Sequence, residues 1–149
     1  MIIKKLEHTN IKTAQNIQQV FQKSYAIEAA LLNAVNFPPL KRPLKNYLHC
    51  KNDFFGYFNG KELHGVIEIK HHNFFTHIQS LVVHPTFFRK GIAQELMVFI
   101  LNRFDKKPFM VETGVKNIPA INLYKKFQFR EIKQWDTDYG VKKIRFERS

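Results

Sequence analysis

The residues with the clearest chemical meaning lie at 84–93, between an extended apolar segment and a predicted helix. Residues 81–83 are strand-like, a turn follows at His84-Pro85, and Arg89, Lys90 and Gly91 precede an apolar helical pattern. A helix start presents backbone N–H groups without intrahelical acceptors, together with the positive end of the helix dipole. Gly91 lets a ligand approach the backbone because it has no Cβ, and the two cations add charge. This stretch therefore predicts a site for a phosphate-bearing anion.

Two well-known phosphate loops are absent from the chain. No segment reads GxxxxGK[ST], and no GxGxxG follows a predicted strand. Neither a P-loop nucleotide site nor a dinucleotide-binding fold is supported.

A second informative stretch, VKNIPAINLYKKFQF, covers residues 115–129. Asn117, Ala120 and Tyr124 are spaced by three and four residues, so on a helix they share one face. A tyrosine on that face can reach into a cleft, although the same spacing also suits an ordinary amphipathic helix.

Together the two stretches resemble the GNAT superfamily, the acetyl-CoA-dependent N-acyltransferases. The pyrophosphate motif [Q/R]-x-x-G-x-[G/A], after a strand ending V-x-P, is matched by Gly91 and Ala93, with Phe88 at the position that is usually Gln or Arg. The later motif N-x-x-A-x-x-L-Y-x-x-x-G-F is matched by Asn117, Ala120, Leu123, Tyr124 and Phe129, with Gln128 in place of the glycine. The resemblance covers about residues 54–135.

The resemblance implies that acetyl-CoA is the cosubstrate and that no metal is needed. The residues that it implies for cofactor binding are Leu81, Val82, Val83, Phe88, Arg89, Lys90, Gly91, Ile92, Ala93, Asn117, Ala120 and Tyr124.

The resemblance also implies direct transfer, in which a substrate amine attacks the acetyl thioester and coenzyme A leaves as a thiolate. Tyr124 is the candidate catalytic donor to that thiolate, since its hydroxyl carries a proton at neutral pH. A main-chain N–H near Leu81 or Val82, where the strand separates from its neighbour, is the expected oxyanion donor.

The base that takes the amine proton has several candidates. His77 occupies a position where the family often has Glu, and a neutral imidazole can do the same work. Alternation along a strand places His77, Gln79 and Leu81 on one face, so Gln79 is expected beside the substrate. Glu68 on the preceding strand is the other candidate base and is also expected near the substrate, and a water chain is a further alternative. His77 could equally be a half-exposed strand residue, and an isolated strand glutamate is usually solvent-facing.

The elements that must position these residues alternate along the chain. Strands are predicted at 2–6, 54–58, 63–69, 76–83, 109–113, 129–135 and 141–146, and helices begin near 11, 26, 44, 91 and 118. A type I′ turn is expected at Asn59-Gly60. We expect an α/β domain of the GNAT-like acyl-CoA N-acyltransferase fold, with a mixed sheet of six to seven strands and about four helices. The acceptor pocket is expected from residues 25–40 with Phe74, Phe75 and Trp135.

Length and composition set the frame for this interpretation. The 149 residues predict one domain, 1–149, and the only cysteine, Cys50, excludes an intramolecular disulfide, so we expect a cytoplasmic protein without a membrane segment. The histidines lack ligand spacing for a metal. The acceptor stays open between small amines, peptide N-termini and lysine side chains, and a longer acyl-CoA and a monomer or homodimer are equally open.

The formal charge of +12 suggests acidic partners. It favours an anionic cofactor first, because only the cations at 89 and 90 have an informative setting, and nucleic acid is the weaker interpretation. The competing function is a non-catalytic module that senses acyl-CoA or binds nucleic acid.

Overall fold

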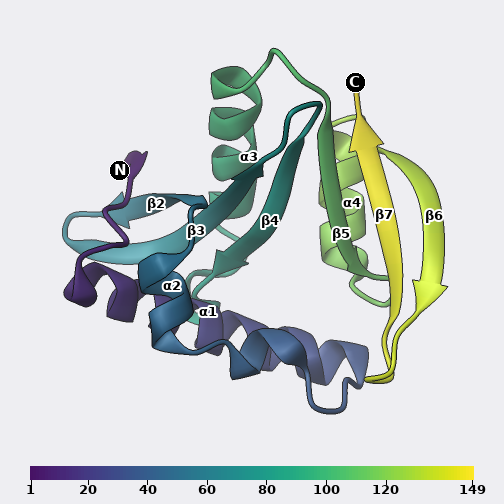
Figure 1. Cartoon of the computed structure of the whole chain (residues 1–149), viewed down its shortest axis with the longest axis horizontal. Helices are drawn as coiled ribbons and strands as arrows, with labels where there is room; N and C mark the ends of the chain where they lie inside the picture. The colour runs from purple at the N-terminus through teal and green to yellow at the C-terminus, as the bar shows by residue number, and fades with distance from the viewer.

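A seven-stranded mixed sheet with four α-helices forms the fold, which confirms the α/β, GNAT-like architecture (Figure 1). The computed structural model describes all residues, 1–149. The elements in chain order are β1 (Ile2–Lys5), α1 (Ile11–Leu32), the 3₁₀ turn η1 (Pro38–Lys41), α2 (Leu44–His49), β2 (Asp53–Asn59), β3 (Glu62–His71), β4 (Thr76–Val83), the 3₁₀ turn η2 (Pro85–Phe87), α3 (Ile92–Arg103), β5 (Phe109–Gly114), α4 (Ile118–Lys126), β6 (Arg130–Asp136) and β7 (Lys142–Arg148). No helix is both long and apolar enough to cross a membrane.

The strands lie in the order β1-β2-β3-β4-β5-β7-β6, and only β4 and β5 are parallel neighbours. Their pairing is short, running from Thr76 opposite Phe109 to Ile78 opposite Val111. Beyond these three residue pairs β4 continues to Val83 and β5 to Gly114 without pairing to each other, and the two strands diverge (Figure 1). The sheet is therefore split from one edge along the β4–β5 line.

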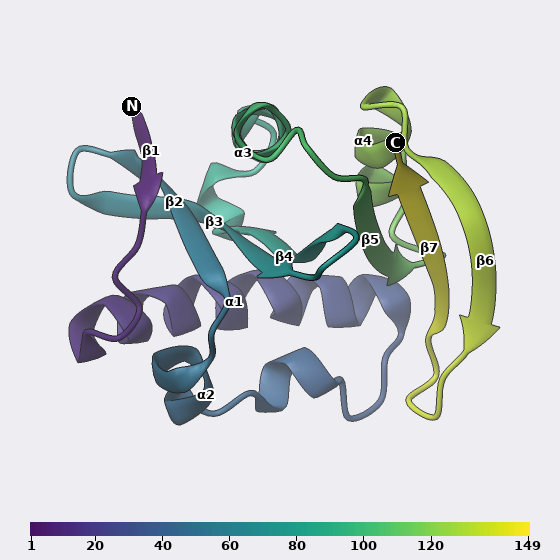
Figure 2. The same ribbon diagram turned by 45° about the horizontal axis from the view of Figure 1, so that its top comes forward.

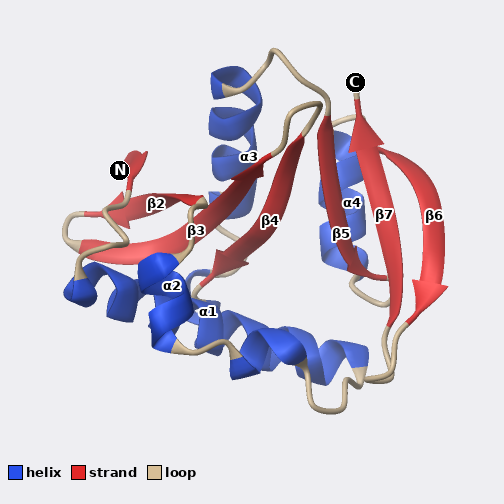
Figure 3. Cartoon of the chain, viewed as in Figure 1, coloured by secondary structure: helices blue, strands red, loops and turns tan.

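Each face of the sheet has its own apolar core. Helices α3 and α4 cover one face, and α1 and α2 cover the other (Figures 2 and 3). The larger core contains Leu96 and Ile100 of α3, packed on β3, β4 and β5. The smaller one packs Ile17 and Phe21 of α1 against Val66 of β3. Burial of alternate strand residues on opposite faces accounts for the near-continuous apolar sequence of the central strands.

Helix α1 is a single helix of 22 residues, so the prediction of two separate helical pieces was wrong. Asn10 caps its start by accepting a hydrogen bond from the Thr13 N–H. The chain has no Gly or Pro between residues 11 and 32, and nothing interrupts the helix until Asn33, whose φ of 52° is left-handed.

The β2–β3 hairpin turns one residue later than predicted. Asn59 pairs with Glu62, so the loop is Gly60-Lys61, and positive φ occurs at Gly60 and not at Lys61. A type II′ turn has this pattern, whereas the expected type I′ turn needs positive φ at both central residues.

A bulge in the β3–β4 ladder overturns the predicted face of β4. Glu68 pairs with Ser80 and Ile69 with Ile78, which leaves Gln79 as an extra residue. Ile78 and Leu81 consequently both face the α3–α4 core. Strict alternation does not hold across a bulge, so His77 lies on the opposite face from Leu81, and the expected grouping of these side chains was wrong.

Candidate active site

Residues 84–94 form a backbone cradle at the start of α3. The Phe88 N–H donates to the Pro85 carbonyl and the Glu95 N–H to the Gly91 carbonyl, but the N–H groups of residues 89–94 between them donate to no protein acceptor. Arg89 and Gly91 have left-handed backbones, with φ of 63° and 77°. No atom lies within 4 Å of the place where a Cβ on Gly91 would be. Successive unpaired N–H groups at a helix start are a ready anion site.

A cleft of about 540 Å³ runs from this cradle between α3 and α4, and we call it the α3–α4 cleft. Of the residues expected to bind cofactor, those that line it are Leu81, Val83, Phe88, Arg89, Gly91, Ile92, Ala93, Asn117, Ala120 and Tyr124. Val82 and Lys90 do not line it. The Val82 side chain packs in the α1 core on the other face, and the Lys90 ammonium lies 5.6 Å from the centre of the Phe87 ring.

Tyr124 lies deep in this cleft. Its side chain is 5% exposed, and its hydroxyl makes no hydrogen bond to a protein atom. Burial, followed by the charge of Glu28, raises the pKa of Tyr124 above its usual value. The hydroxyl is therefore protonated at neutral pH and free to donate to a ligand.

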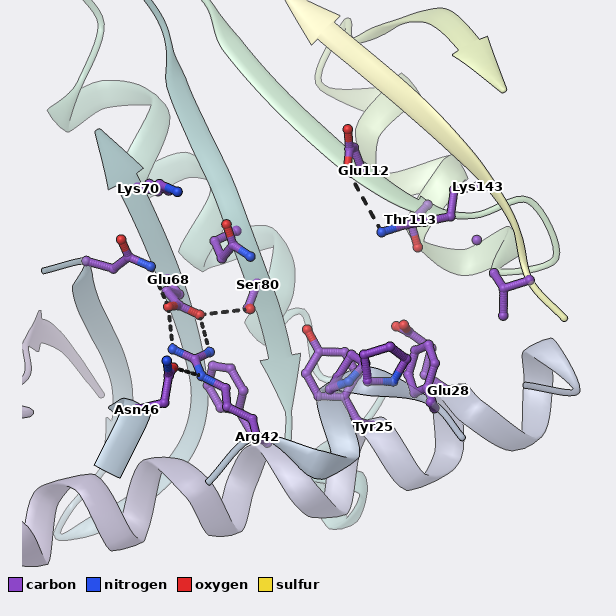
Figure 4. A pocket seen from close by; sticks show the side chains of 18 of the residues that line it. Tyr25, Glu28, Arg42, Asn46, Glu68, Lys70, Ser80, Glu112, Thr113 and Lys143 are labelled. Atoms are coloured by element: carbon purple, nitrogen blue, oxygen red, sulfur yellow. Dashed lines mark hydrogen bonds and ion pairs between the residues drawn. The ribbon is translucent and has the colours of Figure 1, made fainter. Parts of the chain in front are cut away.

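A second opening of about 700 Å³ lies on the other face of the sheet, over α1, and we call it the α1 cavity (Figure 4). The two openings share a small set of lining residues at the place where β4 and β5 separate, namely Tyr25, Glu28, Gln79, Ser80, Glu112 and Thr113. The split in the sheet thus connects the α3–α4 cleft to the α1 cavity.

Glu68 lies in the wall of the α1 cavity and is completely buried, contrary to the expectation of a solvent-facing glutamate. The Arg42 guanidinium donates a hydrogen bond of 2.8 Å to each oxygen of the Glu68 carboxylate (Figure 4). Asn52 and Ser80 each donate one further hydrogen bond to it. Such a bidentate, fully bonded carboxylate has no oxygen left for a substrate proton. The hydrogen bonds of the Glu68 carboxylate therefore have a structural role: they link β3 to β4 and to the segment that follows η1.

Gln79 and His77 have different positions relative to the openings. Gln79 lines both of them. His77 lines neither, and its ring lies 6.2 Å from that of His72. Burial, with the positive charge of His72 and Lys70, lowers the pKa of His77 to about 4. The structure does not bring His77 to either opening: the bulge at Gln79 places it on the face opposite Leu81, and it lies near the β3–β4 turn, beside His72.

The walls of the α1 cavity agree only in part with the expected acceptor pocket. Tyr25, Glu28, Leu32 and residues 37–39 line it. Phe74, Phe75 and Trp135 do not, and Phe74 is 85% exposed. No group of three His, Cys, Asp or Glu side chains is arranged to hold a metal ion.

The residue that sequence reasoning missed is Glu28. It occupies the junction of both openings, and its Oε1 accepts a hydrogen bond of 3.0 Å from the Asn117 side chain. Burial raises its pKa to about 7, against the lowering effects of Lys143 and Asn117. The signal was present in the chain: Phe21, Tyr25, Glu28 and Leu32 are spaced four, three and four apart, so one acid interrupts the apolar stripe of a helix.

A mixed sheet split at its parallel pair, with a backbone anion cradle beside the split, defines an acyl-CoA N-acyltransferase fold. The Acetyltransferase (GNAT) family matches residues 17–129, and the chain belongs to this family.

The chain is also similar to one curated protein and to solved structures of the same fold. UPF0157 protein YqkA of Bacillus subtilis (strain 168) is 30% identical over 131 residues, which are 87% of this chain and 38% of that protein, so the chain spans well under half of this relative. The ribosomal-protein-S18-alanine N-acetyltransferase of Escherichia coli has a similar fold, with a TM-score of 0.76 and 16% identity over 98% of this chain and 91% of that one. The PaiA N-acetyltransferase of Thermoplasma acidophilum, solved in complex with coenzyme A, gives a TM-score of 0.74 and 19% identity over 100% and 99% of the two chains.

Proposed function

We propose that the protein transfers an acetyl group from acetyl-CoA directly to a primary amine. One observation carries the proposal: an opening that begins at unpaired backbone N–H groups meets a second opening where β4 and β5 separate. Two reactants could enter from opposite faces of the sheet and meet at this split. Membership of the GNAT family supports the same reaction.

In this proposal the α3–α4 cleft holds acetyl-CoA. The N–H groups of residues 89–94 receive the pyrophosphate, and Arg89 adds charge beside them. The apolar wall formed by Leu81, Val83 and Ala120 suits the uncharged pantetheine arm. The coenzyme A bound to the Thermoplasma acidophilum relative supports this assignment.

The acceptor amine enters through the α1 cavity and attacks the thioester carbonyl at the split. A C–N bond forms, and a main-chain N–H near Leu81 or Val82 stabilises the oxyanion. When the C–S bond breaks, the Tyr124 hydroxyl donates a proton to the departing sulfur, which leaves as the thiol. Tyr124 suits this role because its hydroxyl is buried, protonated and free of protein partners.

Two measurements with the purified protein test the proposal. Calorimetry with acetyl-CoA and with CoA is expected to show saturable binding of both. Thiol release is then followed with a panel of small amines, peptides with free N-termini and lysine-containing peptides, and at least one class is expected to be acetylated. Absence of binding would contradict the proposal, and binding without turnover of any amine would favour an acyl-CoA-sensing module instead.

A further inference from the structure

Helix α1 places a carboxylate where the two openings meet. Glu28 follows Phe21 and Tyr25 along the buried side of α1 and lies beside Tyr25, beneath the gap between Ser80 of β4 and Thr113 of β5 (Figure 4). It is the only acid in α1. An acid at this place faces the path of a reactant that passes from the α1 cavity to the α3–α4 cleft.

One oxygen of this carboxylate is held and the other is available. The Asn117 amide donates to Oε1 of Glu28 at 3.0 Å and also contacts the Thr113 hydroxyl oxygen at 3.3 Å. The Asn117 carbonyl oxygen accepts from the Ala120 N–H, which fixes the side chain as the N-cap of α4. No protein donor bonds Oε2 of Glu28. The carboxylate is thus oriented by a rigid partner while keeping one oxygen for a ligand.

The groups that face Glu28 leave its charge only partly balanced. Lys143 of β7 opposes the effect of burial on its pKa, which lies near 7. The other ionisable groups at this place are Tyr25, Tyr124, Tyr139 and Glu112. The three tyrosines are uncharged at neutral pH, and Glu112 lies 3.9 Å from the Lys143 ammonium, so it competes for the same cation. A carboxyl in this setting changes its protonation in the range where a general base is most effective.

We propose that Glu28 is the general base that accepts the acceptor amine's proton, and that Asn117 is the residue that positions it. This inference rests on the proposed function. An acceptor ammonium gives one proton to Oε2 of Glu28, and the freed lone pair attacks the acetyl carbon. The second proton leaves the nitrogen as the amide forms and replaces the proton that Tyr124 gives to sulfur. Glu28 then releases its proton to solvent, so the products are the N-acetyl amine, CoA thiol and one proton.

The first test replaces Glu28 by Gln, which keeps an oxygen that can accept from Asn117. For a strongly basic amine, kcat/KM is expected to fall by about 10² to 10⁴ while the affinity for acetyl-CoA is unchanged. The acid limb of the kcat/KM profile, near pH 7 in the native enzyme, is expected to disappear. A weakly basic amine, which is already neutral, is expected to lose far less activity.

The matched control is Glu131→Gln on the exposed edge strand β6, which lines neither opening. It is expected to keep native activity and the native pH profile. Full activity of the Glu28→Gln variant with an unchanged acid limb would overturn the inference. Equal losses for strongly and weakly basic amines would do so as well, because they would indicate a structural defect.

The second test replaces Asn117 by Ser, which can still cap α4 but is too short to reach Glu28. Loss of the amide donor removes a contact that lowers the Glu28 pKa, so the acid limb is expected to move to higher pH. An acid limb that stays in place would remove Asn117 from the positioning role. Failure of native protein to acetylate any amine would instead defeat the proposed function, so the two failures are distinguishable.

Discussion

The cradle at the start of α3 and the α1 cavity are built in different ways. The cradle is made of backbone: consecutive N–H groups at residues 89–94, shaped by two left-handed residues in one short loop. The α1 cavity is made of side chains that come from α1, η1, α2, β3, β4, β5 and β7. A backbone site tolerates many side chains, as Phe88 in place of the usual Gln or Arg illustrates, whereas a side-chain site changes with each substitution. In the proposed function, acetyl-CoA therefore has the tolerant site and the acceptor has the variable one.

The largest effect on CoA binding is expected from a substitution that changes the backbone of the cradle. Gly91→Val places a branched side chain at a φ of 77°, in the open space beside the N–H groups. Loss of about two charged hydrogen bonds to phosphate costs roughly 4 kcal/mol, so the Kd for CoA is expected to rise about a thousandfold in calorimetry. Gly60→Val is the matched control, with a φ of 61°, open space and no ligand nearby. It should lower stability and leave CoA binding intact; equal loss of binding in both variants would contradict a backbone cradle.

The next largest effect is expected from a single side-chain oxygen in the α3–α4 cleft. Tyr124→Phe removes only the hydroxyl, so kcat is expected to fall about a hundredfold if sulfur protonation matters, with CoA affinity unchanged. Rapid thiol-release kinetics measure the first quantity and calorimetry the second. Tyr57→Phe, another buried tyrosine that lines neither opening, is the control. Native turnover in the Tyr124 variant would exclude it from the mechanism.

Glu28, which lies where the two openings meet, should also lower the free energy of unfolding at high pH. A carboxyl whose folded pKa is raised from 4.5 to about 7 contributes stability that is present below its unfolded pKa and lost as pH rises through 7. Glu28→Gln removes this loss, so the variant is expected to be more stable than the native protein in urea unfolding at pH 8, by about 3 kcal/mol, and similarly stable near pH 4. Urea unfolding at both pH values measures the difference. A variant that is less stable at pH 8 would show that Glu28 is held mainly by favourable contacts.

The smallest effect concerns the backbone outside the cradle. Gln128 has a φ of 69° directly after α4, at the position where the family usually has glycine. Gln128→Gly removes left-handed strain of about 1 kcal/mol, partly offset by the flexibility of glycine in the unfolded chain. A gain of roughly 0.5 kcal/mol is expected in denaturant unfolding, without change in CoA binding. A loss of stability would mean that the Gln128 side chain makes contacts worth more than the strain.

The difference between a site made of one backbone segment and a site made of distant side chains also explains how much of the fold and of the site could be predicted from the sequence. The cradle is encoded within about ten consecutive residues, and a strand, a turn, two cations and a glycine predict its place. The positions of the strands and of most helices along the chain follow from equally local patterns, whereas the place of β7 between β5 and β6 was not predicted. The Arg42–Glu68 pair joins residues 26 positions apart, and neither sequence neighbourhood refers to the other.

His77 and Glu28 show the two physical reasons for the remaining errors. The bulge that places His77 and Leu81 on opposite faces depends on the register of two strands, and one extra residue in one of them reverses the faces beyond it. Glu28 was missed because it lies outside both of the motifs that carry the family resemblance. Only the continuous length of α1 places it under the split, so the residue's importance depended on a helix that was predicted as two pieces.

The short parallel pairing of β4 with β5 has a mechanical consequence. Only three residue pairs join the four strands β1 to β4 to the three strands β5 to β7. The sheet therefore consists of two parts that share little backbone hydrogen bonding. Segments with few backbone bonds across them open at the lowest free energy. The amide hydrogens of residues 76–78 and 109–111 should therefore exchange with solvent sooner than those at the middle of β2 and β3. A ligand that contacts both parts of the sheet should slow this exchange.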